Sequence, residues 1–214
     1  MKGRMEPFAI VTGAAAPLPA ANVDTDVIMP KQFLKGIDRS GLAQGAFFDL
    51  RFDGERKPRP EFILNRPGWE DARFLVVGPN FGCGSSREHA VWGLAQLGIR
   101  ALIGTSFAGI FFDNCHRNGI LAIQFPEQEL RPLLDQAADP RTNQFTIDLP
   151  AQTIRAGSSG ADGANGAALR FDIDPWRKDA LVRGLDAIAV TLESAPAIRD
   201  FEREYFAQRP WLLE

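Results

Sequence analysis

Cysteine, histidine and tyrosine are scarce in this chain. Its 214 residues include two cysteines, two histidines and one tyrosine. Two cysteines cannot build an iron–sulfur or zinc site alone, because such a site takes about four protein ligands, or about three with one open position. We therefore expect no metal site in this chain, and we interpret Cys83 and Cys115 as reduced, buried thiols.

Long apolar runs and an excess of positive charge are also missing. No run reaches the roughly 20 apolar residues that a membrane helix needs, and residues 1–7 contain no signal-peptide core. We therefore expect a cytoplasmic protein that does not bind membranes. The formal net charge of −3 and the lack of a basic stripe argue against a nucleic-acid partner.

Apolar sequence is plentiful enough for a sizeable core. Hydrophobic residues make up 45% of the chain and charged residues 24%. At this length we expect residues 1–214 to form a single domain.

Short apolar runs alternate with helical patterns through the middle of the chain. The runs span residues 74–77, 101–103 and 121–123, and the helical patterns span residues 87–97 and 106–117, the second ending at Asn118-Gly119. This alternation with short connections predicts an α/β fold with parallel βαβ units.

The flanking segments add further strands and a tail. Strands are expected at residues 8–12, 145–149, 153–156 and 169–173, and residues 20–29 are expected to form a loop before a helix that starts at Pro30. The glycine-rich residues 156–168 read as a mobile loop without a catalytic part. Residues 175–214 are predicted to be a helical C-terminal extension, whose aromatic side chains either dock on a partner or pack on the chain's own core.

A turn braced by glycines follows the first of the apolar runs. Residues 80–90 read Asn-Phe-Gly-Cys-Gly-Ser-Ser-Arg-Glu-His-Ala. Gly82 and Gly84 permit backbone angles closed to other residues, and Ser85, Ser86 and Arg87 bring two hydroxyls and a guanidinium to the expected helix start. Free amides, a positive helix end and an arginine together suit a carboxylate or phosphate ligand. A plain strand-to-helix turn is the alternative.

Three well-known motifs fit this turn poorly. A dinucleotide fingerprint needs a third glycine where Arg87 stands, a phosphate loop needs a Gly-Lys-Ser/Thr ending, and an esterase elbow needs Gly-x-Ser-x-Gly. What remains is Ser85 in a nest of amides, which could stabilise its alkoxide and let it serve as a base. We interpret His89 as a structural hydrogen bonder that orients the turn, and His116 as a cap that favours the helix dipole.

The order and spacing of several segments resemble one family. Residues 80–90 resemble the signature of the swivelling domain of the aconitase superfamily. Similarity to the small subunits of 3-isopropylmalate dehydratase extends over residues 22–26, 30–34, 106–111, 172–177, 184–186 and 191–192. The resemblance runs through most of the chain, and it implies a swivelling β/β/α domain with a partly parallel sheet, flanking helices and a helical C-terminal tail.

The resemblance also implies an activity. These enzymes isomerise 2-isopropylmalate to 3-isopropylmalate through isopropylmaleate, in leucine biosynthesis. By this likeness the chain is inactive alone and works with a separate large subunit, which carries a [4Fe-4S] cluster held by three cysteines. The substrate would be a small dicarboxylate, this chain would bind no cofactor, and the cluster iron would take the leaving hydroxyl as a Lewis acid.

Individual residues match the family's site. Removing a proton next to a carboxylate requires a base and a nearby cation. Ser85 matches the family's base, and Arg87 matches the arginine that pairs with a substrate carboxylate. Ser86 belongs to the same pattern as a hydrogen-bond donor or helix cap, and Thr25 and Asp26 match a pair near the substrate.

The region after this pair carries the expected specificity. Asp24 is expected to fix the loop, with an Asx-type turn as the alternative. Arg39, with Lys31 as its rival, is the candidate second carboxylate ligand, and Met29 replaces a serine of aconitase-like members, which fits an isopropyl group better than citrate. Residues 31–38 would form the specificity loop, with apolar contacts from Phe33, Leu34 and Ile37.

Two other functions stay open. A related hydro-lyase acting on homoaconitate, citraconate or dimethylmalate would use the same residues. A non-catalytic binding module would use the Gly-Ser-Ser-Arg segment only to capture an anion. A serine and an arginine together, beside Asp26, favour the enzyme.

Overall fold

The computed structural model describes residues 5–34, 40–157 and 167–213. Ile37 and Arg39, which the sequence nominates for specificity and for carboxylate binding, lie outside the described residues. So do residues 158–166, most of the predicted mobile loop.

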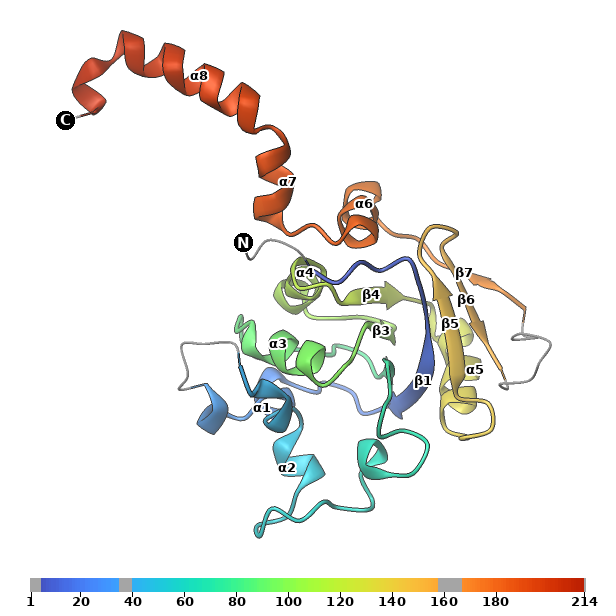
Figure 1. Cartoon of the computed structure of the whole chain (residues 1–214). Coiled ribbons are helices and arrows are strands. Elements are labelled where there is room, and N and C mark those ends of the chain that lie inside the picture. Colours follow the sequence, from blue (N-terminus) through green and yellow to red (C-terminus); the bar gives the residue numbers. More distant parts are fainter. Residues whose placement is uncertain (1–4, 35–39, 158–166, 214) are drawn as a thin grey trace.

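One mixed sheet organises the described part of the chain (Figure 1), with seven strands in the order β4-β3-β2-β1-β5-β6-β7. The strands are β1 (Ile10–Leu18), β2 (Phe74–Val77), β3 (Ala101–Gly104), β4 (Leu121–Gln124), β5 (Gln144–Asp148), β6 (Thr153–Ala156) and β7 (Leu169–Arg170). Strands β1 to β4 run parallel, whereas β5, β6 and β7 extend the sheet beyond β1 in antiparallel fashion. The predicted α/β class and the partly parallel sheet are therefore confirmed.

Helices cover both faces of this sheet. The α-helices of the described residues are α1 (Thr25–Ile28), α2 (Phe48–Arg51), α3 (His89–Gln96), α4 (Gly109–Arg117), α5 (Glu127–Ala137), α6 (Pro175–Arg183), α7 (Ala187–Glu193) and α8 (Ala195–Gln208). One core cluster joins the sheet to α1, α3 and α4, and a second joins its other face to α5 and α6. Helix α5 is not predicted from the sequence, and its Leu130 and Leu133 are buried in the second cluster.

The central strand β1 is longer than the sequence predicts. The expected strand covers residues 8–12, whereas β1 continues to Leu18 through Gly13 and three alanines. Small residues have low strand propensity, but β1 is paired on both sides, and Ala15 and Ala16 are fully buried. A Cβ added to Gly13 would lie 2.2 Å from Arg73 Cγ, so packing selects the small residue here.

The helices after β2 and β3 begin later than expected. Helix α3 starts at His89 rather than at residue 87, and α4 starts at Gly109 rather than at residue 106. The end of α4 agrees with the sequence, because Gly119 follows the helix with a φ of +81° in the left-handed region.

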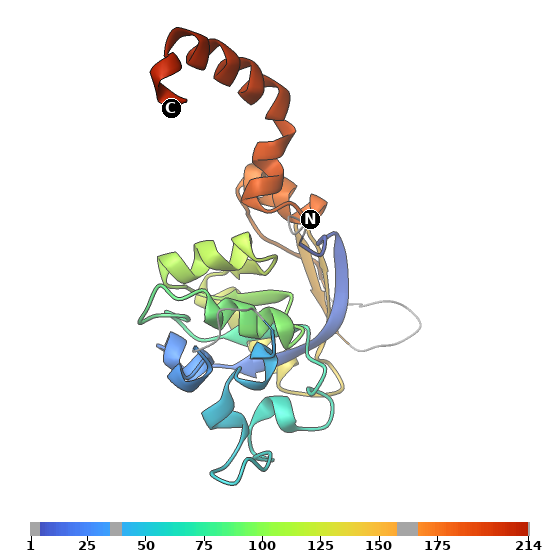
Figure 2. The same ribbon diagram turned by 60° about the vertical axis from the view of Figure 1, so that its left-hand side comes forward.

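The predicted helical tail is present from Pro175 onward, and its outer part leaves the sheet. Helices α7 and α8 contain no buried residue, and Figures 1 and 2 show α8 projecting away from the body. The alternative in which the tail packs on the chain's own core is therefore wrong for α8.

That residues 1–214 form one domain stays a prediction. Across the described ranges, no helix combines the length and the apolar character needed to cross a bilayer.

Candidate functional site

The parallel pairing of β1 and β2 brings two distant loops together. Both strands end at the same edge of the sheet, with Leu18 aligned to Val77, and the carboxyl ends of parallel strands are where open α/β sheets bind ligands. Beyond this edge, the backbone N–H of Gly82 donates to the carbonyl of Val23 at 2.8 Å, and that of Thr25 donates to the carbonyl of Cys83 at 2.8 Å. The segment before α1 is thereby fastened to the glycine-braced turn.

Glycine is required within this turn. Gly82 and Gly84 have φ values of +78° and +98°, which are unfavourable for residues with a Cβ. Gly82 also lacks room, because an added Cβ would lie 2.1 Å from the Cγ of Phe111 in α4. The turn is therefore held by backbone conformation and by close packing on α4.

Helix α1 is capped by Asp24. A carboxylate oxygen of Asp24 accepts a hydrogen bond from Val27 N at 2.7 Å, as an N-cap residue does. Asp24 thus fixes the start of α1. Since residues 25–28 are helical, the expectation that residues 20–29 form a loop is wrong for this part. The cap places Thr25 and Asp26 in the first turn of α1, facing the glycine-braced turn.

A hydroxyl pair lies at the centre of the site. Ser85 Oγ and Thr25 Oγ1 are 2.8 Å apart, and the backbone N–H of Ser85 also donates to Thr25 Oγ1 at 3.3 Å. Arg87 Nε donates to Ser85 Oγ at 2.7 Å. Since Thr25 is only 3% exposed, its hydroxyl is held in place, and it can donate its own proton to Ser85.

Two cations share one carboxylate beside these hydroxyls. Arg87 Nη2 forms an ion pair with Asp26 Oδ1, and Lys31 Nζ lies 3.7 Å from Asp26 Oδ2. The side chains of Arg87 and Asp26 are partly exposed, so the group is open to a ligand. Arg87 and Lys31 thus bring two cations to the hydroxyl pair, and such cations suit an incoming carboxylate.

Ser86 does not take the predicted capping role. Ser86 is exposed. Helix α3 begins three residues later, at His89, and its N-cap residue Glu88 makes no side-chain capping bond. The helix starts late because Ser85 and Arg87 are engaged with α1, which holds the segment in an irregular conformation.

Two asparagines that hold the glycine-braced turn are not predicted from the sequence: one lies in α4 and the other directly follows it. The buried Asn114 donates to the carbonyl of Ser86 at 3.3 Å. Asn118 donates to Glu88 Oε1 at 3.1 Å and accepts from Trp92 Nε1 at 2.9 Å. Both support the turn, and the sequence predicts neither contact; it marks Asn118 only as part of the Asn118-Gly119 helix stop.

The histidines behave differently from one another. The ring of His89 packs on Trp92 with 4.7 Å between ring centroids, and its Nδ1 is buried without a hydrogen-bond partner within the described part of the chain. Burial, together with the nearby Arg177, lowers the pKa of His116 to about 4. Both ring nitrogens of His116 lack a hydrogen-bond partner among the described residues, so its predicted role as a helix cap is wrong.

The apolar residues after α1 pack on the body. Phe33 lies 5.0 Å from Phe48 between ring centroids and packs over Gly45, and Leu34 packs against the core. Met29 is 1% exposed, and its methyl group occupies the space above Gly93 of α3. Met29 therefore stabilises the core and does not line the exposed site, contrary to its interpretation as a feature that favours an isopropyl substrate.

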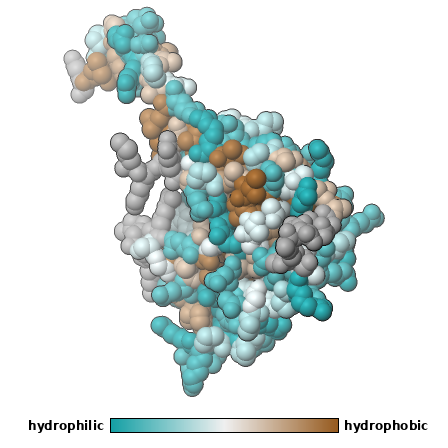
Figure 3. All heavy atoms as spheres, turned by 45° about the vertical axis from the view of Figure 1, so that its right-hand side comes forward, coloured by the Kyte–Doolittle hydropathy of each residue, from teal (hydrophilic) through white to brown (hydrophobic). Residues whose placement is uncertain are grey.

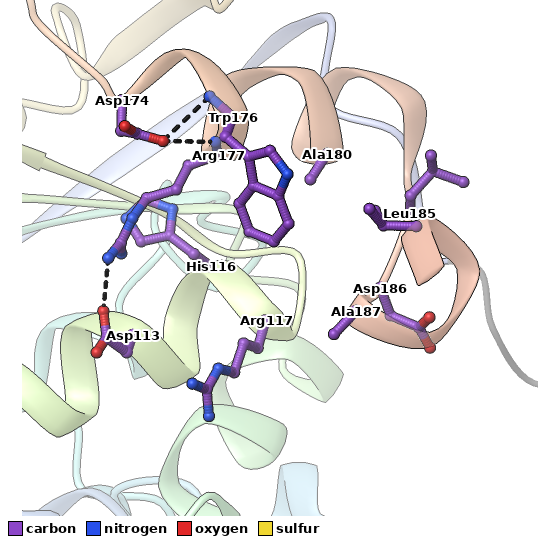
Figure 4. Close-up of a pocket in the computed structure, with 11 residues that line it drawn as sticks. Asp113, His116, Arg117, Asp174, Trp176, Arg177, Ala180, Leu185, Asp186 and Ala187 are labelled. Carbon is purple, nitrogen blue, oxygen red and sulfur yellow. Dashed lines mark hydrogen bonds and ion pairs between the residues drawn. The ribbon is translucent and has the colours of Figure 1, made fainter. Parts of the chain in front are cut away.

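A cavity of about 560 Å³ lies elsewhere, between α4, α6 and α7 (Figure 4). The indole of Trp176 and the side chain of Leu185 border it, and Arg177 pairs with Asp113 across its edge at 2.7 Å. It shares no residue with the Ser85 group, so we do not assign the chemistry to it.

The side chains present do not fit an iron–sulfur cluster. Over the described ranges, no three His, Cys, Asp or Glu side chains are grouped so that they could hold a metal ion. Cys115 is fully buried, and burial raises the pKa of its thiol well above the ordinary value. Cys83 is a free thiol as well, but it is half-buried, contrary to the expected full burial.

Family models match two parts of the chain. Residues 5–128 match the aconitase C-terminal domain. Residues 188–214 match the C-terminal domain of the 3-isopropylmalate dehydratase small subunit. The second match covers most of α7, all of α8 and the end of the chain.

Relatives align over nearly the whole length. The chain is 55% identical over 208 residues to 3-isopropylmalate dehydratase small subunit 1 of Mannheimia succiniciproducens, covering 97% of this chain and 99% of that one. It is 52% identical over 208 residues to small subunit 2 of Salmonella typhimurium, covering 97% and 96%. Among solved structures, 3-isopropylmalate dehydratase from Methanocaldococcus jannaschii superposes with a TM-score of 0.62 at 25% identity, covering 90% of this chain and 99% of that one.

Proposed function

Because the chain belongs to the family of 3-isopropylmalate dehydratase small subunits, we propose that it is the small subunit of a hydro-lyase that isomerises 2-isopropylmalate to 3-isopropylmalate in leucine biosynthesis. The enzyme is active only when a large subunit is present. The observation that carries this proposal is the placement of Ser85, Thr25 and Arg87: Arg87 Nε donates to the serine oxygen, and the Thr25 hydroxyl lies 2.8 Å from it.

Ser85 acts as the base in this proposal. An alkoxide at Ser85 Oγ would accept hydrogen bonds from Arg87 Nε and from the hydroxyl of Thr25. The alkoxide takes the proton from the substrate carbon next to a carboxylate, and the electron pair moves into that carboxylate as an aci-carboxylate. When water is added back, Ser85 delivers a proton to the neighbouring carbon, the one that lost the hydroxyl, and is an alkoxide again.

Arg87 stabilises the charge that develops on the substrate. Its contacts with Ser85 and Asp26 use two of its five N–H groups. The others are available to a substrate carboxylate, which a guanidinium binds better in the aci form because that form carries more charge. Asp26 holds the guanidinium in this orientation.

The remaining site residues bind and select the substrate. Ser86 and Lys31 are both exposed near Arg87 and supply a hydroxyl and an ammonium group to a dicarboxylate. Arg39 is the candidate ligand of the second carboxylate, and Lys31 is its rival. The apolar contacts of the specificity loop are Phe33, Leu34 and Ile37, of which Phe33 and Leu34 would have to turn outward from their present packing.

The large subunit is the proposed source of the [4Fe-4S] cluster. Among the described residues, no group of side chains fits a cluster, whereas Ser85 and Arg87 supply a base and a carboxylate clamp. When bound, a cluster iron supplies Lewis acidity toward the hydroxyl that leaves. A cytoplasmic location and the absence of membrane and nucleic-acid partners belong to the same proposal.

The test is isomerisation of 2-isopropylmalate, followed through the absorbance of isopropylmaleate, with and without an anaerobically reconstituted large subunit. Turnover only in the mixture is the expected result. Turnover of citraconate, homoaconitate or dimethylmalate in place of isopropylmalate would change the assigned substrate but support the same type of reaction. No turnover of any of these compounds would favour a module that only binds anions.

A further inference from the structure

The C-terminal helices expose an unusual amount of apolar surface. We call residues 187–213 the arm; it contains α7, α8 and a final turn at Pro210–Leu212. Of the twelve large apolar side chains exposed within the described residues, seven lie on the arm. The arm face consists of Ile188, Leu192, Ile198, Phe201, Trp211 and Leu213, and Figure 3 shows apolar surface on the part of the arm next to the body. Exposed apolar surface of this kind marks an interaction site.

Specific contacts fix the direction of the arm at its root. The carboxylate of Asp186 accepts a hydrogen bond from Ala189 N at 2.7 Å and caps α7. Arg183 of α6 forms an ion pair with Glu193 of α7. Helix α6 is itself anchored, because Leu181 is 1% exposed and its carbonyl accepts from Phe8 N at 2.9 Å.

The arm leans toward the side of the molecule that carries the candidate site. In both Figure 1 and Figure 2, α8 extends over the side of the sheet covered by α1, α3 and α4, away from β5, β6 and β7. Thr25 begins α1 on that side, and Ser85, in the turn before α3, contacts it. A protein bound over the Ser85 group would therefore be within reach of the arm face as well.

The two family matches separate the arm from the rest of the chain. Residues 5–128 match the aconitase C-terminal domain, whereas residues 188–214 match a model of the small subunit's own C-terminal domain. A domain joined covalently to its partner gains a high effective concentration from the connection. A separate small subunit lacks this connection and needs additional interface. A second copy of this chain could cover the arm, but it would leave the site without its partner.

We propose that the arm face is the docking surface through which this chain binds the large subunit. This inference rests on the proposed function, because it takes the existence of the large subunit from it. The partner presents an apolar groove to the face formed by Ile188, Leu192, Ile198 and Phe201, while its catalytic region covers Ser85.

Charge substitutions on the arm test the proposal. Ile188→Asp and Phe201→Asp should each weaken binding of the large subunit at least about tenfold, measured by calorimetry or sedimentation. Ile10→Asp is the matched control, because Ile10 and Ile188 are both 64% exposed and Ile10 lies on β1, outside the arm. Circular dichroism checks that each variant keeps its helices. With wild-type protein, the large subunit should also protect Arg199 and Arg203 from trypsin.

Each outcome separates this inference from the proposed function. Turnover by the wild-type pair tests the function, whereas the affinity difference between the arm variants and Ile10→Asp tests the arm. Equal affinities in a pair that turns over would overturn the arm proposal alone. If the free chain dimerises, and the arm variants abolish the dimer while binding the large subunit normally, the arm contacts a second copy and the proposal is also wrong. If the arm variants bind weakly, their kcat should return to the wild-type value at saturating large subunit.

Discussion

Arg87 Nε donates a hydrogen bond of 2.7 Å to Ser85 Oγ, while Nη2 of the same guanidinium is paired with Asp26. One side chain thus orients the proposed base and remains available to the substrate. Such an arrangement pre-organises charge before the substrate binds, and pre-organised donors are a large source of transition-state stabilisation.

Ser85→Ala tests the base directly. The change removes the hydroxyl that accepts from Arg87 and contacts Thr25, and nothing else in the turn depends on Oγ. We expect kcat of the assembled enzyme to fall by about 10²- to 10⁴-fold, the usual contribution of general base catalysis. Steady-state kinetics at saturating large subunit provides the measurement.

Ser86→Ala is the matched comparison for this experiment. Ser86 is adjacent and exposed, and its structural contact with Asn114 uses the backbone carbonyl, which the substitution keeps. We expect mainly a higher KM. Equal losses of kcat in the two variants would refute the assignment of Ser85 as the base.

Arg87→Lys tests the shared guanidinium. A lysine has a single nitrogen and cannot reach Ser85 and Asp26 while also forming a bidentate bond with a carboxylate. We expect kcat/KM to fall at least about 100-fold, although the positive charge is kept. Isothermal titration with isopropylmaleate would show the accompanying loss of affinity, and an unchanged affinity would rule out the carboxylate clamp.

Thr25→Val separates the hydrogen bond of Thr25 from its packing. Valine has nearly the same shape and fits a position that is 3% exposed, but it cannot donate to Ser85. We expect kcat to fall at least about tenfold, since one of two donors to the alkoxide is lost, a change of roughly 1.4 kcal/mol. Thr25→Ser restores a hydroxyl and should recover most of the loss. If Val and Ser behaved alike, Thr25 would be only a packing residue.

The strands of the parallel half could be predicted from the sequence because they are short, buried apolar runs. The predicted strand at residues 74–77 coincides with β2, and Gly119 ends α4 as the pattern indicates. Strand β1 was predicted too short, because its Gly-Ala segment has no strand propensity and is specified by neighbours far away in the sequence. Local patterns do not contain that information.

The candidate site shows the same division. Ser85, Arg87 and the glycines were visible as a local cluster, but the contact between Thr25 and Ser85 spans 60 residues and depends on the pairing of β1 with β2. Only the family resemblance placed the two segments together in advance. Asn114 was missed because an asparagine on a helix carries no signal of its own, and its role follows from the loop that packs above it.

Gly82→Ala tests the rigidity of the turn. The substitution places a Cβ in the left-handed region and within 2.1 Å of Phe111 Cγ. We expect a loss of about 2–4 kcal/mol in the free energy of unfolding, from backbone strain and overpacking together. Urea denaturation of the free subunit measures it.

Gly109→Ala supplies the control for that loss. Gly109 begins α4, and a Cβ added there would meet nothing within 4 Å. Alanine lowers the entropy of the unfolded chain and suits a helix, so this variant should be neutral or slightly more stable. Similar losses at both positions would show that the turn is not specially constrained.

His116 predicts a dependence of stability on pH. Burial is the main cause that lowers its pKa from an ordinary 6.5 to about 4, with Arg177 acting in the same direction and Asp113 and Asp174 opposing it. Between these two pH values, His116 is therefore protonated to a greater extent in the unfolded chain than in the folded chain. Stability is full above about pH 6.5 and falls as the pH drops toward 4, by at most about 3 kcal/mol from this residue.

His116→Met should remove this part of the acid sensitivity. Both ring nitrogens of His116 are buried without hydrogen-bond partners among the described residues, so an apolar side chain of similar size forfeits no hydrogen bond there. We expect the variant to be at least as stable as the wild type at pH 7 and to gain relative to it as the pH falls from 6.5 to 4. Chemical denaturation at a series of pH values measures the difference, in which the shared contributions of the carboxylates cancel. A constant difference across this range would mean that His116 keeps an ordinary pKa, and that protonation of its ring does not disfavour the contact between α4 and α6.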